Sequence, residues 1–229
     1  MTALPPRVAM ISGASRGIGA AIAERLAGAG WQLSLGMRSP MAQAAAMVHA
    51  YDAAAQEAEG DWVAATLARF GRIDAIICNA GLLIQKSVVE ISDAEMMEML
   101  AVNLRAPQRL ARAAWPHLKA SGAGRVVILS SLSGLRVASE ASGAYAVTKH
   151  AVTALAHALR HAGWEHGIRA TAICPGFVAT DMAMAATSLA PERMTQPAEV
   201  ARLVEMALDL PNSASVTEIA VNWQPEGKF

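Results

Sequence analysis

Short apolar runs recur along the whole chain and alternate with amphipathic stretches. Runs this short and apolar on both faces are typical of buried parallel strands. The expected strands are Val8–Ser12, Leu33–Gly36, Met47–Tyr51, Ile73–Cys78, Val126–Ser130, Ala170–Cys174 and Thr217–Val221. Between them, apolar residues such as Ile18, Ile22 and Leu26 repeat at helical spacing. This alternation predicts an α/β fold with a doubly wound, mostly parallel sheet and helices on both faces.

Neither a linker nor a repeat interrupts the pattern, so we expect a single domain over residues 1–229. One crossover is short. The ten residues from Met37 to Ala46 are about the minimum of ten to twelve for a parallel crossover, which predicts a helix of one or two turns at most. Ser92 and Glu95 form a capping box that begins a helix expected to run to about Leu118.

The composition excludes several classes of function. Lys+Arg 19 balances Asp+Glu 19, so no net positive field attracts nucleic acid or an anionic membrane. No apolar run approaches the roughly 18 residues of a membrane span, and Met1–Arg7 does not resemble a signal peptide. Cys78 and Cys174 end apolar runs and are expected to be buried, reduced thiols. We therefore expect a cytoplasmic protein.

A glycine-rich turn follows the first expected strand. Gly13-Ala-Ser-Arg-Gly-Ile-Gly19 has the spacing GxxxGxG and begins an expected helix. Glycines permit a tight turn and let backbone N–H groups approach a pyrophosphate at the positive end of the helix. Taken alone, the motif also fits an ordinary turn between a strand and a helix.

A second motif pairs Tyr145 with Lys149. Four residues apart on a helix, their side chains share a face. A phenol has an ordinary pKa of about 10, so it becomes an acid–base group near neutral pH only where a positive charge favours the phenolate. Lys149 would supply such a charge. For the pair alone, a packed tyrosine beside an exposed lysine is the other interpretation.

The order of the motifs is more specific than any one of them. The chain carries, in sequence, the glycine turn, Asn79-Ala80-Gly81, Ser130-Ser131, Tyr145xxxLys149 and Pro175-Gly176. In this order, from about Arg7 to Val221, the chain resembles the short-chain dehydrogenase/reductase family. The resemblance implies a Rossmann-type sheet and a nicotinamide-dependent oxidoreductase that acts on a small carbonyl or alcohol substrate.

The resemblance also implies roles for individual residues. Tyr145 would be the general acid/base, Lys149 would lower its pKa and hold the nicotinamide ribose, and Ser131 would bind the reacting oxygen. Asn103 would anchor a water of the proton relay. Pro107 gives a physical reason for that water, because it lacks the N–H that the Asn103 carbonyl would accept in a helix.

The remaining implied contacts are with the dinucleotide. Asp52 matches a carboxylate that contacts adenine, and residues 175–180 match a loop that holds the carboxamide. The full implied set is Gly13, Ser15, Arg16, Gly17, Ile18, Gly19, Arg38, Asp52, Asn79, Ala80, Gly81, Tyr145, Lys149, Pro175, Gly176, Val178 and Thr180.

One spacing departs from the family pattern. Ser131 lies fourteen residues before Tyr145, one more than is usual. Leu132 occupies the usual position and cannot bind the reacting oxygen. We take Ser131 as the catalytic serine because it directly follows the strand, with the extra residue absorbed in the loop Arg136–Gly143; Ser133 is the alternative.

The residues at the end of the second strand predict NADP(H) rather than NAD(H). NAD-using relatives carry an aspartate there that binds the ribose hydroxyls and repels a 2′-phosphate. Here the position is Met37, and Arg38 follows it. Arg16 in the glycine turn is a second basic residue, and two guanidiniums would form charge-assisted hydrogen bonds with the phosphate. A merely solvated Arg16 is the alternative.

Two other functions compete with the oxidoreductase hypothesis. An epimerase or dehydratase of the extended relatives would need a larger C-terminal substrate domain, and 48 residues follow Asp181. A redox-silent, dinucleotide-binding regulator would usually have lost Tyr145 or Lys149. Residues 181–196 are expected to form a short lid over a mostly apolar pocket, flanked by Met182, Met184 and Met194.

Self-association is expected through two helices, about Asp93–Leu118 and Ala144–His161, which the family commonly pairs across a two-fold axis. The positions expected to face outward on the second helix are Ala151, Ala154, His157, Ala158 and His161. We therefore predict a dimer or tetramer. No carboxylate or cysteine accompanies the histidines of this helix in sequence, so we expect no metal site.

Overall fold

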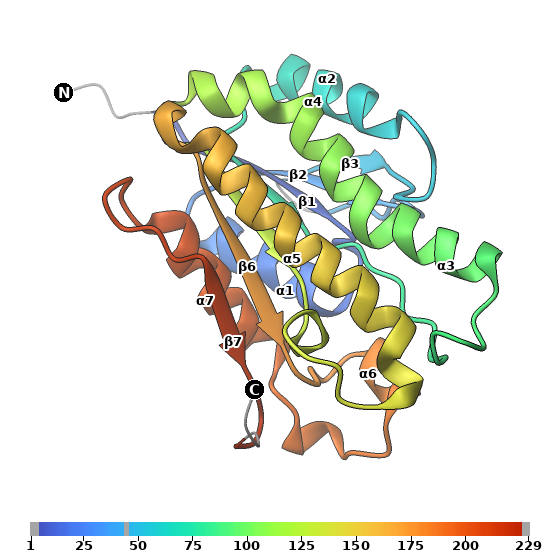
Figure 1. Ribbon diagram of the computed structural model, residues 1–229. Helices are drawn as coiled ribbons and strands as arrows, with labels where there is room; N and C mark the ends of the chain where they lie inside the picture. The colour runs from blue at the N-terminus through green and yellow to red at the C-terminus, as the bar shows by residue number, and fades with distance from the viewer. Residues whose placement is uncertain (1–4, 44–45, 226–229) are drawn as a thin grey trace.

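Seven parallel strands form one sheet in the computed structural model, which describes residues 5–43 and 46–225 (Figure 1). The strands are β1 Val8–Ser12, β2 Gln32–Met37, β3 Ala46–Ala50, β4 Ala75–Cys78, β5 Arg125–Leu129, β6 Arg169–Pro175 and β7 Glu218–Val221. Their order is β3-β2-β1-β4-β5-β6-β7. The expected doubly wound sheet is confirmed, with its switch in strand order between β1 and β4. The first half of Met1–Arg7 and residues 226–229 lie outside the described residues.

Helices cover both faces of the sheet (Figure 1). They are α1 Gly17–Gly28, α2 Ala58–Phe70, α3 Asp93–Leu100, α4 Ala106–Ala120, α5 Gly143–Gly163, α6 Asp181–Ala186 and α7 Pro197–Asp209. One face packs against α1 and α7, where Ile22, Leu26 and Val204 are fully buried. The other packs against α2, α4 and α5 through residues such as Trp62 and Leu110. The apolar periodicity of the sequence thus has a direct counterpart in two buried layers.

The short crossover between β2 and β3 differs from the expectation. Residues 38–43, the described part of this connection, contain no helical turn. Pro40 restricts the residue before it to extended conformations, which disfavours a helix at this point. The one- or two-turn helix expected there is therefore not formed in these residues.

The helix expected from Ser92 to Leu118 is interrupted. Its capping box is present: Ser92 Oγ accepts from Glu95 N at 3.3 Å, and the Glu95 carboxylate accepts from Ser92 N at 3.0 Å. Residues Ala101–Arg105 then form a π-helical turn between α3 and α4. Pro107 cannot donate the hydrogen bond that an α-helix would require at Asn103, and a wider turn resolves this conflict.

Both cysteines are buried and free, as expected. Burial raises the pKa of the Cys78 thiol to about 12, which leaves it unreactive. None of the helices in the described part of the chain combines the length and the apolar character that crossing a bilayer requires.

Candidate active site

A cleft of about 1220 Å³ lies at the carboxyl ends of the strands, where α/β sheets of this kind bind ligands. Among the residues predicted for the site, all but Gly19 and Asn103 line it. Gly19 lies behind the glycine turn, where a Cβ would be 2.3 Å from the Gly13 carbonyl oxygen. Asn103 is buried beneath the cleft at 2% exposure. The sequence motifs therefore converge in space, with these two residues as supports.

A network of hydrogen bonds joins the end of β1 to the end of β4. Ser12 Oγ accepts from the backbone N–H groups of Asn79 at 3.0 Å and Ala80 at 3.1 Å. In return, Asn79 Nδ2 donates to the carbonyls of Ser12 and Gly13, each at 3.0 Å. Ser12 was missed by the sequence analysis, although a serine ending a buried strand before a glycine turn was a usable signal. The two loops form one rigid unit at the switch point.

The glycine turn keeps the backbone open at the N-terminus of α1. Gly13 and Gly17 have φ values of +66° and +57°, which disfavour a residue with a side chain. A Cβ on Gly17 would lie 3.1 Å from the Thr180 side chain, so the turn lies against residues 175–180. Amide groups at a helix N-terminus bind phosphate, and no acidic residue occupies the first turn of α1. These features fit the pyrophosphate of a dinucleotide.

Tyr145, Ser131 and Lys149 meet at the wall of the cleft. The Ser131 side chain neighbours the Tyr145 hydroxyl and lowers its pKa. Lys149 Nζ donates to the Leu129 carbonyl at 2.8 Å and lies 5.5 Å from the centroid of the Tyr145 ring. Ser131 Oγ also accepts from Ser133 N at 3.1 Å, so the extended Ser131 begins a short 3₁₀ turn over 132–134. This geometry places Ser131, rather than Ser133, beside the phenol.

Burial dominates the acid–base properties of this group. It raises the pKa of Tyr145 above its ordinary value, and the hydrogen bond from Ser131 lowers it by less. Burial also lowers the pKa of Lys149 to about 8. From the sequence we expected Lys149 to lower the pKa of Tyr145 and favour the phenolate. In the protein alone the pKa of Tyr145 is raised instead, because burial removes water from the phenol and outweighs the hydrogen bond from Ser131.

The Asn103 side chain acts as a brace under the cleft. Its Oδ1 accepts from Leu82 N, and its Nδ2 donates to the Leu82 carbonyl, both at 2.8 Å. Nδ2 also donates to Thr148 Oγ1 at 3.0 Å. The π-turn thereby fixes both the segment after Gly81 and the helix turn that carries Tyr145 and Lys149.

The positions predicted to select the cofactor lie at one end of the cleft. Met37 is buried at 1% exposure and packs in the core, whereas Arg38 is exposed on the cleft wall. Arg16 does not extend freely toward Arg38, because its guanidinium pairs with Asp181 at 2.5 Å. Asp52 follows β3 and accepts from Ala54 N at 2.9 Å, which shapes the next loop.

The expected lid, residues 181–196, contains α6 and a 3₁₀ turn over Pro191–Arg193. Thr180 caps α6, and Gln85 Nε2 donates to the Ala186 carbonyl at 3.1 Å. Met182 and Met184 are exposed and line the cleft. Met194 does not flank the cleft as expected, because it is buried at 4% exposure and faces a different pocket.

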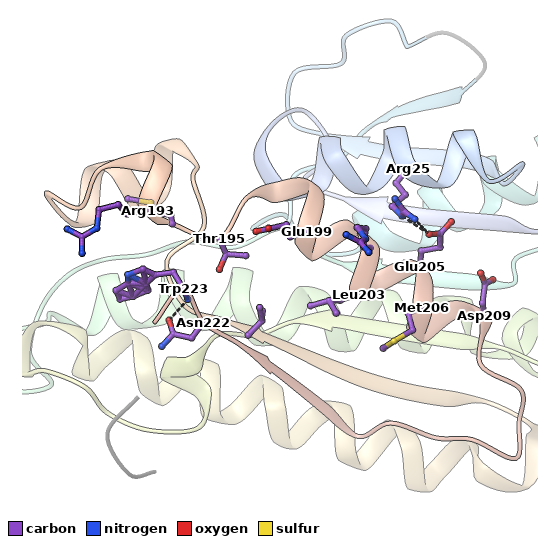
Figure 2. A pocket seen from close by; sticks show the side chains of 13 residues that line it. Arg25, Arg193, Thr195, Glu199, Leu203, Glu205, Met206, Asp209, Asn222 and Trp223 are labelled. Atoms are coloured by element: carbon purple, nitrogen blue, oxygen red, sulfur yellow. Dashed lines mark hydrogen bonds and ion pairs between the residues drawn. The ribbon is translucent and has the colours of Figure 1, made fainter. Parts of the chain in front are cut away.

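That second pocket, of about 810 Å³, lies between α7 and the end of β7 (Figure 2). Arg25 and Glu205 form an ion pair on one wall, while Asn222 and Trp223 line both pockets. The C-terminal segment after β7 therefore separates the two hollows.

The histidines of α5 differ from the expectation in one respect. His157 Nε2 lies 2.7 Å from Glu218 Oε1 of β7, so a carboxylate does accompany it in space, and its side chain is only partly exposed, at 39%. His161 is exposed, as expected. Within the described ranges, no three histidine, cysteine or acidic side chains gather as metal ligands would.

Comparisons with known proteins agree with this geometry. Residues 7–190 match the family model of the short chain dehydrogenases. An agropine synthesis reductase of Rhizobium rhizogenes is 39% identical over 91% of this chain, which spans about half the length of that curated relative. An uncharacterized oxidoreductase of Staphylococcus saprophyticus is 30% identical over 96% of this chain and 99% of its own length. The alcohol dehydrogenase of the archaeon Thermococcus sibiricus, solved with 5-hydroxy-NADP, is 31% identical with a TM-score of 0.85, covering 97% of this chain and 99% of its own.

The lowered pKa of Lys149 makes a prediction about stability. Unfolded lysine has a pKa of about 10.4, so between pH 8 and 10 the unfolded chain binds more protons at this position than the folded chain does. The cost of burying the Lys149 charge is therefore relieved, and the folded state is stabilised, as pH rises. Lys149→Met should raise the free energy of unfolding at pH 7 by roughly 1–3 kcal/mol. The gain is reduced by the loss of the hydrogen bond that Lys149 donates to the Leu129 carbonyl. Urea denaturation from pH 7 to 10 should show this advantage shrinking. Lys119→Met, an exposed control on α4, should show no such trend; an advantage of Lys149→Met that is constant with pH would contradict the argument.

Proposed function

The chain belongs to the short-chain dehydrogenase family of NAD(P)-dependent oxidoreductases, and on that premise we propose an NADP(H)-dependent enzyme with Tyr145 as its general acid/base. Its reaction is hydride transfer between nicotinamide and the carbonyl or secondary alcohol carbon of a small, mostly apolar substrate. The observation that carries the proposal is that Tyr145, Ser131 and Lys149 line the same cleft as the glycine turn, with Lys149 Nζ 5.5 Å from the centroid of the Tyr145 ring. A redox-silent regulator would not need this complete set.

When a nicotinamide dinucleotide is bound, it would supply the hydride that the carbonyl carbon accepts in the reduction direction. Tyr145 donates its phenol proton to the carbonyl oxygen, and Ser131 hydrogen-bonds the same oxygen as negative charge develops there. A phenol whose pKa burial has raised remains protonated at neutral pH and is ready to act as the acid. In the oxidation direction the positive charge of the nicotinamide would favour the phenolate.

Lys149 and Asn103 complete the proposed machinery. The Lys149 ammonium is held at the Leu129 carbonyl, 5.5 Å from the centroid of the Tyr145 ring, and it would hold the nicotinamide ribose. Asn103 would anchor a relay water at its backbone carbonyl, because Pro107 cannot donate the ordinary helical hydrogen bond to it. Reprotonation of Tyr145 would run along this path.

We propose NADP(H) as the preferred dinucleotide. Arg38 is exposed at the end of β2, and buried Met37 replaces the carboxylate that would repel a 2′-phosphate. The complex of the Thermococcus sibiricus relative with 5-hydroxy-NADP supports this choice. Because Arg16 pairs with Asp181, Arg38 would carry most of the selectivity.

Apolar side chains line part of the cleft. They are Leu82, Leu83 and Val102, together with Met182 and Met184 of α6. We propose that residues 181–196 form a short substrate lid on a single dinucleotide-binding domain.

The first prediction concerns catalysis. Tyr145→Phe removes one oxygen, so the fold and dinucleotide binding should persist while kcat falls at least about a hundredfold. Ser131→Ala should reduce kcat far more than Ser133→Ala, its matched control two positions further along the chain, which also lines the cleft. A substrate for the assay comes from following NADPH oxidation with a panel of ketones and aldehydes. Near-normal kcat in Tyr145→Phe would refute the assignment, and the reverse order of the serines would reassign the oxygen-binding role.

The second prediction concerns cofactor preference. One charged hydrogen bond is worth about 1.5–3 kcal/mol, so Arg38 should favour NADPH over NADH roughly tenfold to hundredfold in kcat/KM. Arg38→Ala should remove most of this preference and leave NADH kinetics little changed. Arg16→Ala should have the smaller effect, because Arg16 is already paired. Equal use of the two dinucleotides by the unmodified protein would overturn the proposal.

The third prediction concerns assembly. The outward side of α5 exposes Val147, Ala154, Ala158 and His161, which are small enough for close packing about a two-fold axis. Light scattering at micromolar concentration should therefore report a dimer or tetramer. A single species of 23.9 kDa would contradict it.

A further inference from the structure

A buried ion pair lies behind the adenosine end of the cleft. Arg109 of α4 and Glu59 of α2 have side chains that are 13% and 2% exposed. Arg109 Nε donates to Glu59 Oε2 at 2.9 Å and Nη2 to Oε1 at 3.0 Å, a bidentate pairing. Neither residue lines the cleft, so the pair does not touch the dinucleotide site directly.

The same pair holds the loop that follows β3. Arg109 Nη2 also donates to the backbone carbonyls of Ala53 at 2.9 Å and Ala55 at 3.1 Å. Tyr51 donates its hydroxyl to Glu59 Oε1 at 2.9 Å. Residues 51–55 are therefore fixed at three points from behind, while Tyr51, Asp52, Ala53 and Ala54 form the cleft wall in front.

The support extends to the neighbouring strand. The Tyr51 ring lies 4.8 Å from that of Trp62, centroid to centroid. Trp62 packs under Gly36, where a Cβ would be 2.7 Å from its ring. Gly36 in turn accepts a hydrogen bond from Gly13 N at 2.9 Å. One buried cluster thus backs the β2 end, the β3 loop and the start of the glycine turn.

An ion pair is not the simplest way to fill this space. Well-packed apolar residues of similar volume are often as stabilising as a buried ion pair. They could not hold the two carbonyls of the loop, however, whereas the planar guanidinium offers donors in fixed directions. The feature that requires Arg109 and Glu59 is the shape of residues 51–55.

We propose that Arg109 and Glu59 are positioning residues for the adenosine half of the dinucleotide, which they preorganise by fixing the loop of residues 51–55. The inference rests on the proposed dinucleotide site and adds to it a pair of residues outside the cleft. Preorganisation improves binding because the loop is already ordered before the ligand arrives. Loss of the pair should weaken binding of the adenosine half and leave the Tyr145 end of the cleft unchanged.

The test uses the whole chain and a ligand that carries only the adenosine half. Removing Arg109 alone would leave a buried carboxylate unpaired, so the main variant is the double substitution Arg109→Met with Glu59→Leu. Arg109→Lys keeps the charge but loses the fork geometry. Arg112→Met, an exposed position on the same helix, is the matched control. Calorimetry gives Kd for NADPH and for 2′,5′-ADP, kinetics give KM and kcat, and thermal unfolding gives Tm.

In the double variant, Kd for 2′,5′-ADP and for NADPH should rise together by about tenfold or more, the equivalent of roughly 1.4 kcal/mol. KM for NADPH should rise with them, while kcat changes much less. Arg109→Lys should lie between the two, and Arg112→Met should match the unmodified protein. A double variant that loses Tm but keeps both Kd values would show the pair to be structural and overturn the inference. An unmodified protein that binds neither ligand would instead overturn the proposed function, and the inference with it.

Discussion

The site depends on one set of hydrogen bonds at the switch point of the sheet. Ser12 Oγ accepts two backbone N–H groups of the β4 loop, and the Asn79 amide donates to two carbonyls of the β1 loop. Parallel strands alone would leave these two loops free to separate. The exchange locks them together, so the glycine turn has one fixed shape against the wall formed by Ala80 and Gly81. Gly13 and Gly19 both lie close to the Asn79 side chain. A Cβ on Gly19 would clash with it, at 2.5 Å from Asn79 Nδ2, so this packing requires glycine there.

A second dependence runs along the interrupted helix from α3 to α4. Its π-turn places Asn103 under the Tyr145–Lys149 helix turn, and two turns later Arg109 reaches the loop after β3. The same interrupted helix therefore supports both the Tyr145 end of the cleft and the loop of residues 51–55. Pro107 causes the wide π-turn because it lacks the N–H of a regular helix, and this turn contains Asn103, which faces α5.

The sequence predicted the strands, their parallel arrangement and the cleft residues that belong to motifs at the ends of strands, because these depend on apolar periodicity and on those motifs. It did not predict contacts between residues distant in the chain. Ser12 with Asn79, Arg16 with Asp181, His157 with Glu218 and the Arg109–Glu59 pair each join separate elements. The direction of the Tyr145 pKa was also missed, since helical spacing shows which groups are neighbours but not how much water burial removes. Met194 is a further example. Its position in the sequence led us to expect it beside the cleft, but its side chain is buried at 4% exposure.

The central claim is that this cleft holds a dinucleotide with its nicotinamide beside Tyr145 and Ser131. A crystal structure of the chain with NADP⁺ tests it most directly. We expect the pyrophosphate at the N-terminus of α1, the 2′-phosphate in contact with Arg38, and the reactive carbon of the nicotinamide facing the Tyr145 hydroxyl. A dinucleotide bound elsewhere, or bound here with the nicotinamide turned away from Tyr145, would contradict it.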